Sequence, residues 1–594
     1  MGPACGQCGK INGSMSDCFL PQCITADGLQ RGVMSINRQI PGPSIHVCQN
    51  DQIVVDVTNL MAGTSTTIHW HGLHQKETPF MDGVPFITQC PIDFATTFRY
   101  TFKASEPGTQ FYHSHTGHHK VNGHYGGFVI RRPKSKDPNR RLYDHDLKEH
   151  LIVASDWMND FGEFFSPGLP SKKENLKPTS YLINGRGTII DQEQHRPKLA
   201  TPLAFFRVRS GQRYRFRFVN SMSHSCPVLL EIEGHSMQII ASDSFDLQPV
   251  MIDSLVSTSG ERYDFVLHAN HQTGSSFWIR LRALGLCEAN KIEQFAVLAY
   301  APSSVSDLIL TYPQRRFPKY AEPFVKNERR FLNHPNATCS DLRKNKKSLC
   351  ITDLSSYEKF PNITDVIPDH RFVLGFTMNN RPLSEIIRSN HYENFLALSE
   401  RVVAVGTINN ITFTFPSYSL LTQRDEVDES LFCDESNRPE KCDDVEICSC
   451  IHRIKVEQGS IVELVIVDEA KTINLVNHPF HLHGYKLHVI GMGQHPDGIP
   501  MTVKLAKQMI KQRTLRKSLN NMHPIKDTIS IPSRGYTIFR FKADNPGWWF
   551  LHCHFEWHIN VGMSLVLQVG EKTEMVQPPE NFPKCNSFTP KILL

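Results

Sequence analysis

The segment WWFLHCHFEWHIN, residues 548–560, places three histidines, one cysteine and one glutamate within seven consecutive positions. Its aromatic and apolar beginning is typical of a β-strand. Successive side chains of a strand point to opposite faces, so His552 and His554 would face one way and Cys553 the other. One short piece of backbone could therefore serve two metal centres, provided that other parts of the chain supply the remaining ligands.

The chain repeats one strand–turn–strand pattern three times. Residues 47–59, 208–220 and 456–468 share a polar turn flanked by alternating β-branched or aromatic residues. Such repetition predicts three consecutive domains of the same kind. Regularly spaced strands with Gly- and Pro-containing turns favour β-sandwiches or barrels.

Paired histidines occur in the first and third repeats. Four His-x-His pairs are present: His69/His71, His113/His115, His481/His483 and His552/His554. In the middle repeat the matching frames read Glu231-Ile-Glu233 and Ile279-Arg-Leu281. Both imidazoles of a pair lie on the same face of a strand. We therefore expect one histidine cluster, shared by the first and last domains, with too many imidazoles for one metal ion and enough for three.

The cysteine face of the 552–554 strand indicates which metal is bound. Imidazole pairs alone leave Cu, Zn, Fe and Ni open. On the opposite face, His478, His558 and Met563 are candidates to join Cys553. Two histidines and a cysteine with a weak axial methionine are typical of a blue-copper electron-transfer site. Zinc has no redox chemistry and would gain nothing from a thioether, so the pattern favours copper.

With these motifs the chain resembles the three-domain multicopper oxidases, over about residues 25 to 570. Four motifs carry the resemblance, in the order of the family: His69-Trp-His71-Gly, His113-Ser-His115, His478-Pro-Phe-His481-Leu-His483-Gly and His552-Cys-His554-Phe-Glu-Trp-His558-Ile-Asn-Val-Gly-Met563. The resemblance implies an all-β fold of three consecutive cupredoxin-like Greek-key β-sandwich or barrel domains. The Cys-bearing N-terminal tail and residues 39–59 look most like the arthropod branch of laccases.

The resemblance also implies four copper ions and a ligand set for each. The type 1 copper would be held by His478, Cys553 and His558, with Met563 axial. The type 2 copper would be held by His69 and His481. The two type 3 coppers would be held by His71, His113 and His554, and by His115, His483 and His552. Electrons would pass from the type 1 site through Cys553 to His552 and His554, and O₂ would be reduced to water at the trinuclear cluster.

Two acidic residues and two cysteines match further positions of the family. Asp82 and Glu556 match carboxylates that deliver protons. Asp82 could instead be a turn residue in Asp-Gly, and Glu556 a surface charge. Cys90 and Cys585 match a family disulfide that ties the first domain to the C-terminal tail.

The repeats, the composition and the resemblance together divide the chain into six segments. These are a Cys-containing N-terminal tail (1–24), a first cupredoxin-like domain with trinuclear ligands (25–148), a second without copper (149–302), a linker or insertion rich in Pro, Lys, Asn and Ser (303–370), a third with type 1 and trinuclear ligands (371–580) and a C-terminal tail (581–594).

Composition indicates a secreted protein. The net charge of +5 is mild and like charges do not form long blocks, so neither nucleic acid nor an anionic membrane is implied as a partner. No apolar run approaches the roughly 18 residues that span a bilayer. Sixteen dispersed cysteines indicate an oxidising compartment. Four acceptor sequences add glycosylation: Asn12, Asn336, Asn362 and Asn410. If Cys553 binds metal, an odd number of cysteines remains, so at least one is unpaired or bonded to another chain.

The motifs imply O₂ as the electron acceptor and leave the small-molecule reductant less defined. A laccase acting on phenols and diphenols is the leading hypothesis, and a ferroxidase or ascorbate oxidase with the same coppers is the alternative. Many laccases hold the phenol with a carboxylate of the second domain, where this chain has Ser225 and, a few residues on, Glu231 and Glu233. Glu231 is therefore the candidate substrate-binding residue. A copper-storage protein or a structural glycoprotein is also considered, but such a protein would not need both an electron route through Cys553 and all the ligands of a trinuclear cluster.

Overall fold

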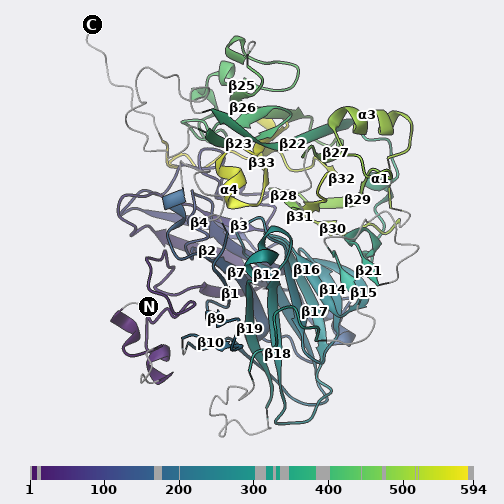
Figure 1. Cartoon of the computed structure of the whole chain (residues 1–594). Helices are drawn as coiled ribbons and strands as arrows, with labels where there is room; N and C mark the ends of the chain where they lie inside the picture. Colours follow the sequence, from purple (N-terminus) through teal and green to yellow (C-terminus); the bar gives the residue numbers. More distant parts are fainter. Residues whose placement is uncertain are drawn as a thin grey trace.

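The fold is built almost entirely of β-strands (Figure 1). The computed structural model describes residues 3–9, 15–165, 177–199, 201–301, 316–324, 330–334, 347–382, 402–442, 445–470, 476–515, 517–518 and 521–585. Within these residues the α-helices are short, the longest being α3 (Val503–Lys511). None of the helices described is long and apolar enough to cross a membrane. The all-β class expected from the sequence is confirmed.

The first domain consists of two packed sheets. One has the strand order β1-β6-β5-β3 and the other pairs β2 with β4. The strands are β1 (Gly42–Cys48), β2 (Gln52–Thr58), β3 (Ile68–His71), β4 (Thr97–Lys103), β5 (Gly108–Ser114) and β6 (Tyr125–Arg131). Alternating apolar residues of β2 and β4 face Trp70, Tyr112 and Phe128 of the other sheet and form its core.

The second domain is a larger two-sheet sandwich, drawn in teal in Figure 1. Its sheets have the orders β11-β19-β18-β13-β16-β20-β21 and β15-β14-β17-β12-β7-β8. The strands are β7 (Leu151–Trp157), β8 (Ser180–Ile183), β11 (Phe205–Val208), β12 (Arg213–Asn220), β13 (Val228–Ile232), β14 (Met237–Ser242), β15 (Phe245–Ile252), β16 (Ser254–Ser257), β17 (Arg262–His268), β18 (Ser276–Ala283), β19 (Glu293–Tyr300), β20 (Phe331–Leu332) and β21 (Ser348–Leu349), with a small separate pair β9 (Ile190–Asp191) and β10 (Arg196–Pro197). Part of the expected linker 303–370 therefore extends this sheet.

The third domain, drawn in green to yellow in Figure 1, is one continuous path of strands in the order β30-β29-β32-β27-β22-β23-β24-β26-β34-β33-β28-β31. The elements are α1 (Pro361–Thr364), β22 (His370–Pro382), β23 (Val402–Ile408), β24 (Ile411–Phe413), β25 (Phe432–Cys433), β26 (Cys448–Val456), β27 (Ile461–Asp468), β28 (His478–Leu482), β29 (Leu487–Gln494), β30 (Ile525–Lys526), β31 (Thr528–Ile531), β32 (Gly535–Lys542), β33 (Gly547–Cys553), α4 (Glu556–Asn560) and β34 (Ser564–Val569). Trp548 and Phe550 of β33 belong to the same hydrophobic cluster as Trp70 of the first domain, so the first and third domains share a core.

Disulfides occur in the N-terminal tail and in the three domains. Among the described residues the bonds are Cys5–Cys23, Cys8–Cys18, Cys90–Cys585, Cys226–Cys287, Cys433–Cys450 and Cys442–Cys448. The Cys90–Cys585 bond ties the first domain to the C-terminal tail. In the described part of the chain two cysteines are free, the exposed Cys48 and the buried Cys553.

Candidate metal centres

Strand register brings the histidine pairs of the first and third domains together. In the first domain, antiparallel β3 and β5 place His69 opposite His113. In the third, β28 and β33 place His481 opposite His552. Rings from the two domains then meet in the middle, with centroids 3.9 Å apart for His71 and His481 and 4.0 Å apart for His69 and His483.

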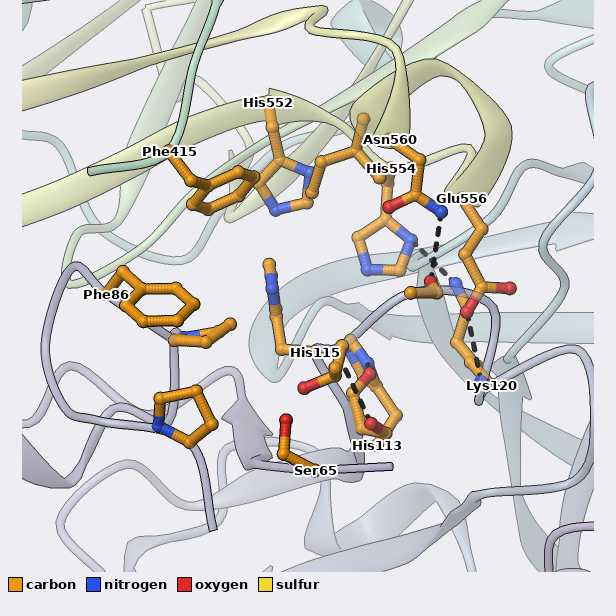
Figure 2. Close-up of a pocket in the computed structure, with 16 residues that line it drawn as sticks. Ser65, Phe86, His113, His115, Lys120, Phe415, His552, His554, Glu556 and Asn560 are labelled. Atoms are coloured by element: carbon orange, nitrogen blue, oxygen red, sulfur yellow. Dashed lines mark hydrogen bonds between the residues drawn. The ribbon is translucent and has the colours of Figure 1, made fainter. Parts of the chain in front are cut away.

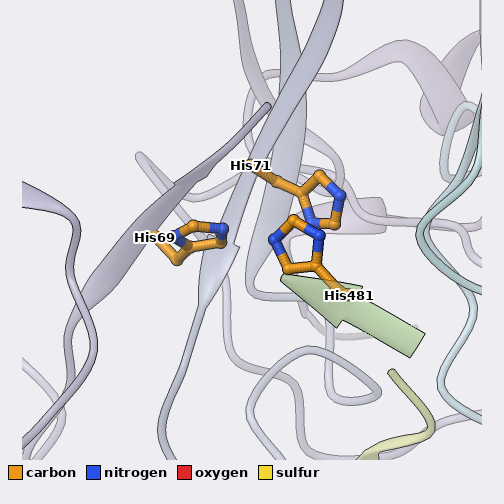
Figure 3. A group of neighbouring side chains, drawn as sticks. All are labelled: His69, His71 and His481. Atoms are coloured by element: carbon orange, nitrogen blue, oxygen red, sulfur yellow. The ribbon is translucent and has the colours of Figure 1, made fainter. Parts of the chain in front are cut away.

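The eight imidazoles form three groups, two of which share His71, and within each group the ligand atoms lie within 4.8 Å of one another. The groups are His69, His71 and His481; His71, His113 and His554; and His115, His483 and His552. Figure 3 shows the first group, in which His69 lies across from the stacked rings of His71 and His481. The last two groups have the same members as the type 3 sets implied by the sequence, and His69 and His481 of the first are the type 2 set.

One nitrogen of most rings is already occupied by the protein. In four rings Nδ1 donates to a backbone carbonyl: His69 to Asp82 (2.8 Å), His113 to Ser114 (2.8 Å), His481 to Asp527 (2.9 Å) and His552 to Cys553 (2.9 Å). In a fifth ring, His483, Nδ1 donates to the Oδ2 atom of Asp82 at 2.9 Å. Ligating histidines characteristically use their second nitrogen in this way, because the bond fixes the tautomer and the ring orientation.

Three of the other nitrogens are buried without partners. Nε2 of His69, His113 and His481 is shielded from solvent and has no hydrogen-bond partner in the described structure. Leaving buried polar atoms unsatisfied is costly, and three in one cluster require an explanation. Bound metal ions explain them, so the residues present fit a metal cluster.

His71 is oriented the other way round. Its Nε2 lies 3.0 Å from the hydroxyl of Thr528 and 3.2 Å from the Asp527 carboxylate. Its Nδ1 lies 3.2 Å from Nε2 of His554. The ring therefore offers Nδ1, not Nε2, to the cluster.

Burial favours the neutral form of the rings in this cluster whose pKa it lowers. It lowers the pKa of His115 to about 3 and of His481 to about 4, and it holds the pKa of His113 well below the usual value. A neutral imidazole has a free lone pair, which is the form that binds a metal. These rings are therefore ready to bind a metal throughout the neutral pH range.

A second group lies on the other face of β33. Nδ1 of His478 and of His558 lie 3.7 and 3.5 Å from the sulfur of Cys553. The sulfur is buried, and burial raises the pKa of the thiol well above its usual value. A thiolate there needs a cation beside it, which a metal supplies. Met563 is buried in the same core, and its carbonyl accepts the Cys553 amide at 3.1 Å.

A cavity of about 290 Å³ reaches the histidine cluster from outside (Figure 2). His113, His115, His552 and His554 line its inner part, and the side chains of Lys120, Glu556, Phe86 and Phe415 are among its walls. Most of its lining is apolar carbon, which suits a small uncharged molecule such as O₂. The cavity therefore provides an access route to the cluster.

Known proteins with similar sequences show to which family this chain belongs. Residues 21–135, 148–303 and 419–573 each match a family model described as multicopper oxidase. Laccase-3 from Thanatephorus cucumeris is 29% identical over 572 residues, covering 91% of this chain and 88% of that protein. The L-ascorbate oxidase of Brassica rapa subsp. pekinensis is 27% identical over 552 residues, with the same two coverages of 91% and 88%.

Solved structures agree on the fold. The crystal structure of Fet3p, a multicopper oxidase that functions in iron import, matches with a TM-score of 0.66 at 24% identity and covers 94% of this chain and 91% of that one. The three-domain cupredoxin-like fold expected from the sequence is thus confirmed. The chain is a copper-binding oxidoreductase with O₂ as its acceptor. It belongs to the multicopper oxidase family.

The two acidic residues singled out by the sequence lie at the cluster. Asp82 directly follows the short turn Pro79–Met81 and is fully buried, with its carboxylate against His483. Glu556 is only 6% exposed, so the alternative of a surface charge is wrong. Its carboxylate accepts the backbone amides of Lys120 and Val121 at 3.0 and 3.1 Å. Burial raises the pKa of Glu556 to about 7.

Glu231 does not lie where a substrate could reach it. The residue is 2% exposed in β13, inside the second domain. Its carboxylate pairs with Arg280 at 2.5 Å and accepts the hydroxyl of Ser254 at 2.9 Å. The assignment of Glu231 as a substrate-binding residue is therefore wrong: Leu230 and Ile232 of β13 face the main core, and Glu231, on the opposite face of the strand, is covered and paired with Arg280.

Two of the four glycosylation sequences can be placed. Asn362 in α1 and Asn410 in the turn between β23 and β24 are exposed. Asn12 and Asn336 lie outside the described residues.

The sequence did not reveal several residues that hold the ligands. Asp527 pairs with Arg262 and lies against His71, and Ser259 hydrogen-bonds to His554. The only signal for Asp527 was a charged Lys-Asp pair inside an otherwise apolar strand pattern. Ser259 and Arg262 carried no signal, because they belong to the domain that has no histidine pairs.

Proposed function

We propose that the chain is a laccase-like multicopper oxidase that binds four coppers in the ligand sets implied by its motifs. The type 1 copper would be held by His478, Cys553 and His558 together with Met563, and the other three by the eight paired histidines. The observation that carries the proposal is the set of buried, unpartnered Nε2 atoms facing one another beside a separate His₂Cys group. When bound, the coppers supply one-electron oxidation of the reductant and reduction of O₂ to water.

The chain itself connects the two sites. Cys553 is covalently flanked by His552 and His554, which belong to the two different type 3 groups. His552 also donates from Nδ1 to the Cys553 carbonyl at 2.9 Å, which shortens the path between sulfur and imidazole. A reductant oxidised at the outer group is thus joined to the buried cluster through a few covalent bonds and one hydrogen bond.

Reduction of O₂ consumes protons, and we assign their delivery to two carboxylates. Glu556 lines the access cavity together with His554, where it can exchange a proton with solvent in that cavity. Asp82 lies at the other side of the cluster and contacts His483 directly. Each therefore lies beside one of the two type 3 groups.

The favoured reductant is a phenol or diphenol, because several relatives are named laccases. Ferroxidase or ascorbate oxidase activity is the second candidate, since an L-ascorbate oxidase and a protein of iron import are also among the similar proteins. The arthropod branch of laccases is proposed on residues 39–59 and the Cys-bearing tail, whose cysteines pair as Cys5–Cys23 and Cys8–Cys18.

We also propose that the protein is secreted and glycosylated. The disulfides tie segments far apart in sequence, which requires an oxidising compartment. Asn362 and Asn410 are exposed and free to carry glycans.

Oxygen uptake by copper-loaded protein tests the assignment. With a panel of a diphenol, Fe²⁺ and ascorbate, we expect the highest kcat/KM for the diphenol. Equal or higher values for Fe²⁺ or ascorbate would select the second candidate. Cys553→Ser should abolish the blue colour and turnover with every reductant, and retained turnover would refute the proposed connection between the sites.

A further inference from the structure

The second domain contacts the histidine cluster through residues 258–262, which comprise the turn between β16 and β17 and the first residue of β17 and are called turn 258–262 below. Gly260 in this turn has φ +87°, and a Cβ atom on it would lie 2.9 Å from Cγ of His554. Any larger residue would push the imidazole away, so the close approach depends on glycine. The turn therefore rests directly on the edge of a ligand ring.

Ser259 in the same turn determines which nitrogen of His554 is free. Its Oγ lies 2.9 Å from Nδ1 of His554. The single hydroxyl proton has carbonyl acceptors, that of Met222 and that of His554 at 3.1 Å. A hydroxyl has one proton, so the oxygen accepts from the imidazole, and Nδ1 carries its proton. Nε2 of His554 then presents a lone pair toward His71.

Lys120 does not reverse this arrangement. Its ammonium, which has three protons, donates to the Met222 carbonyl at 3.0 Å and to Ser259 Oγ at 3.5 Å, and it lies 3.4 Å from Nδ1 of His554. The Ser259 contact with the ring is the closer one, at 2.9 Å. Ser259 is therefore the main partner of the imidazole.

Arg262, at the end of turn 258–262, acts through Asp527 on His71, the ring that faces His554. Arg262 is fully buried and binds both oxygens of Asp527, at 2.6 and 2.5 Å. The same carboxylate lies 3.2 Å from Nε2 of His71. A bidentate guanidinium–carboxylate pair is geometrically rigid. It fixes Asp527 and so turns His71 with Nδ1 toward His554.

We propose that turn 258–262 is a positioning element for one type 3 copper, through Ser259 on His554 and Arg262 with Asp527 on His71. His71 belongs to the first domain and His554 to the third, and this turn of the second domain holds both rings with their free nitrogens 3.2 Å apart. The inference rests on the proposed copper assignment. Loss of such an outer partner typically lowers metal affinity by about 10–100-fold.

Ser259→Ala tests the proposal on copper-loaded protein. We expect copper of the trinuclear cluster to be lost to a competing chelator at about 10–100-fold lower chelator concentration than in the wild type. Electron paramagnetic resonance should then detect the uncoupled type 3 copper, while the visible absorption of the type 1 site is unchanged. Ser259→Thr keeps the hydroxyl and should retain copper as the wild type does.

Ser254→Ala is the matched control, because Ser254 is a buried serine of the same domain whose hydroxyl bonds Glu231 and no ligand histidine. If Ser259→Ala does not fold, Ser259→Val against Ser259→Thr compares two side chains of one shape that differ by the hydroxyl. Wild-type copper retention in Ser259→Ala or Ser259→Val, or simultaneous loss of the type 1 absorption, overturns the inference alone. Wild-type protein that takes up no copper would overturn the proposed function as well.

Discussion

Replacement of Asp82 by Asn isolates the charge of one carboxylate beside the histidine cluster. Oδ2 of Asp82 accepts Nδ1–H of His483 at 2.9 Å, and Oδ1 lies 3.4 Å from Nδ1 of His69. Oδ1 is buried and has no hydrogen-bond partner among the described residues, because Nδ1–H of His69 donates to the Asp82 backbone carbonyl at 2.8 Å. Asparagine keeps the shape, and its amide oxygen can still accept from His483, but the substitution removes the negative charge from this hydrogen bond.

The expected loss follows from these contacts. A hydrogen bond to a charged acceptor contributes about 1.5–3 kcal/mol and a neutral one about 1 kcal/mol. The difference, roughly 0.5–2 kcal/mol, corresponds to a change of about 2- to 30-fold, since 1.4 kcal/mol is about a factor of ten. We expect kcat for O₂ reduction to fall by about 10–30-fold, where this range overlaps the 10–100-fold typical of outer partners of metal ligands.

Steady-state oxygen uptake measures the effect, with the reductant varied at fixed O₂. KM for the reductant and the blue absorption should stay at wild-type values, because the His478–Cys553–His558 group lies on the other face of β33. Asp27→Asn is a suitable control, since Asp27 is equally buried and bonds Ser180 away from the cluster. Unchanged kcat in Asp82→Asn, or a parallel loss of the blue absorption, would show that the carboxylate does not act on the cluster in this way.

Three further outcomes follow from other parts of the molecule. Burial raises the pKa of Glu293 from 4.5 to about 7, so the ionised carboxylate destabilises the fold increasingly as the pH rises from 4.5 to 7. Urea unfolding should therefore show that Glu293→Gln raises the free energy of unfolding by on the order of 3 kcal/mol at pH 8 and does not raise it at pH 4. Phe415→Trp adds volume at the wall of the 290 Å³ cavity and should raise KM for O₂ while leaving KM for the reductant unchanged, which oxygen-electrode kinetics would decide. Among the described residues the free thiols are the exposed Cys48 and the buried Cys553. Of these two, an alkylating reagent should modify Cys48 alone in the native protein, and peptide mass spectrometry that finds Cys553 labelled first would contradict the structure.

The sequence predicted the parts of the site that follow from strand geometry. His-x-His pairs place two imidazoles on one face wherever the segment is a strand, and β3, β5, β28 and β33 all include or adjoin such a pair. The same alternation predicted that the Cys553 side chain lies on the opposite face of the strand from His552 and His554. These features need only local backbone conformation, which residue type and spacing specify.

Contacts created by domain packing could not be predicted from strand geometry. Ser259 meets His554 although 295 positions separate them, and Arg262 meets Asp527 across 265 positions. No periodicity in either segment encodes these meetings, since they depend on how three domains dock. The prediction for Glu231 was wrong for a related reason. Its closeness in sequence to an expected substrate position does not determine which face of the strand its side chain lies on.

The way the ligand rings are held indicates where the site is vulnerable to substitution. His69, His113, His481 and His552 donate to backbone carbonyls, which every residue provides, so these orientations survive side-chain changes at the acceptor.

Three other rings depend on side chains: His483 on Asp82, His71 on Asp527 and Thr528, and His554 on Ser259. Those supports come from the first, third and second domains respectively. Sensitivity of the cluster to outer substitutions should therefore concentrate at a few positions spread over all three domains. The second domain, which supplies no histidine to the cluster, therefore contributes to it through Ser259 and Arg262.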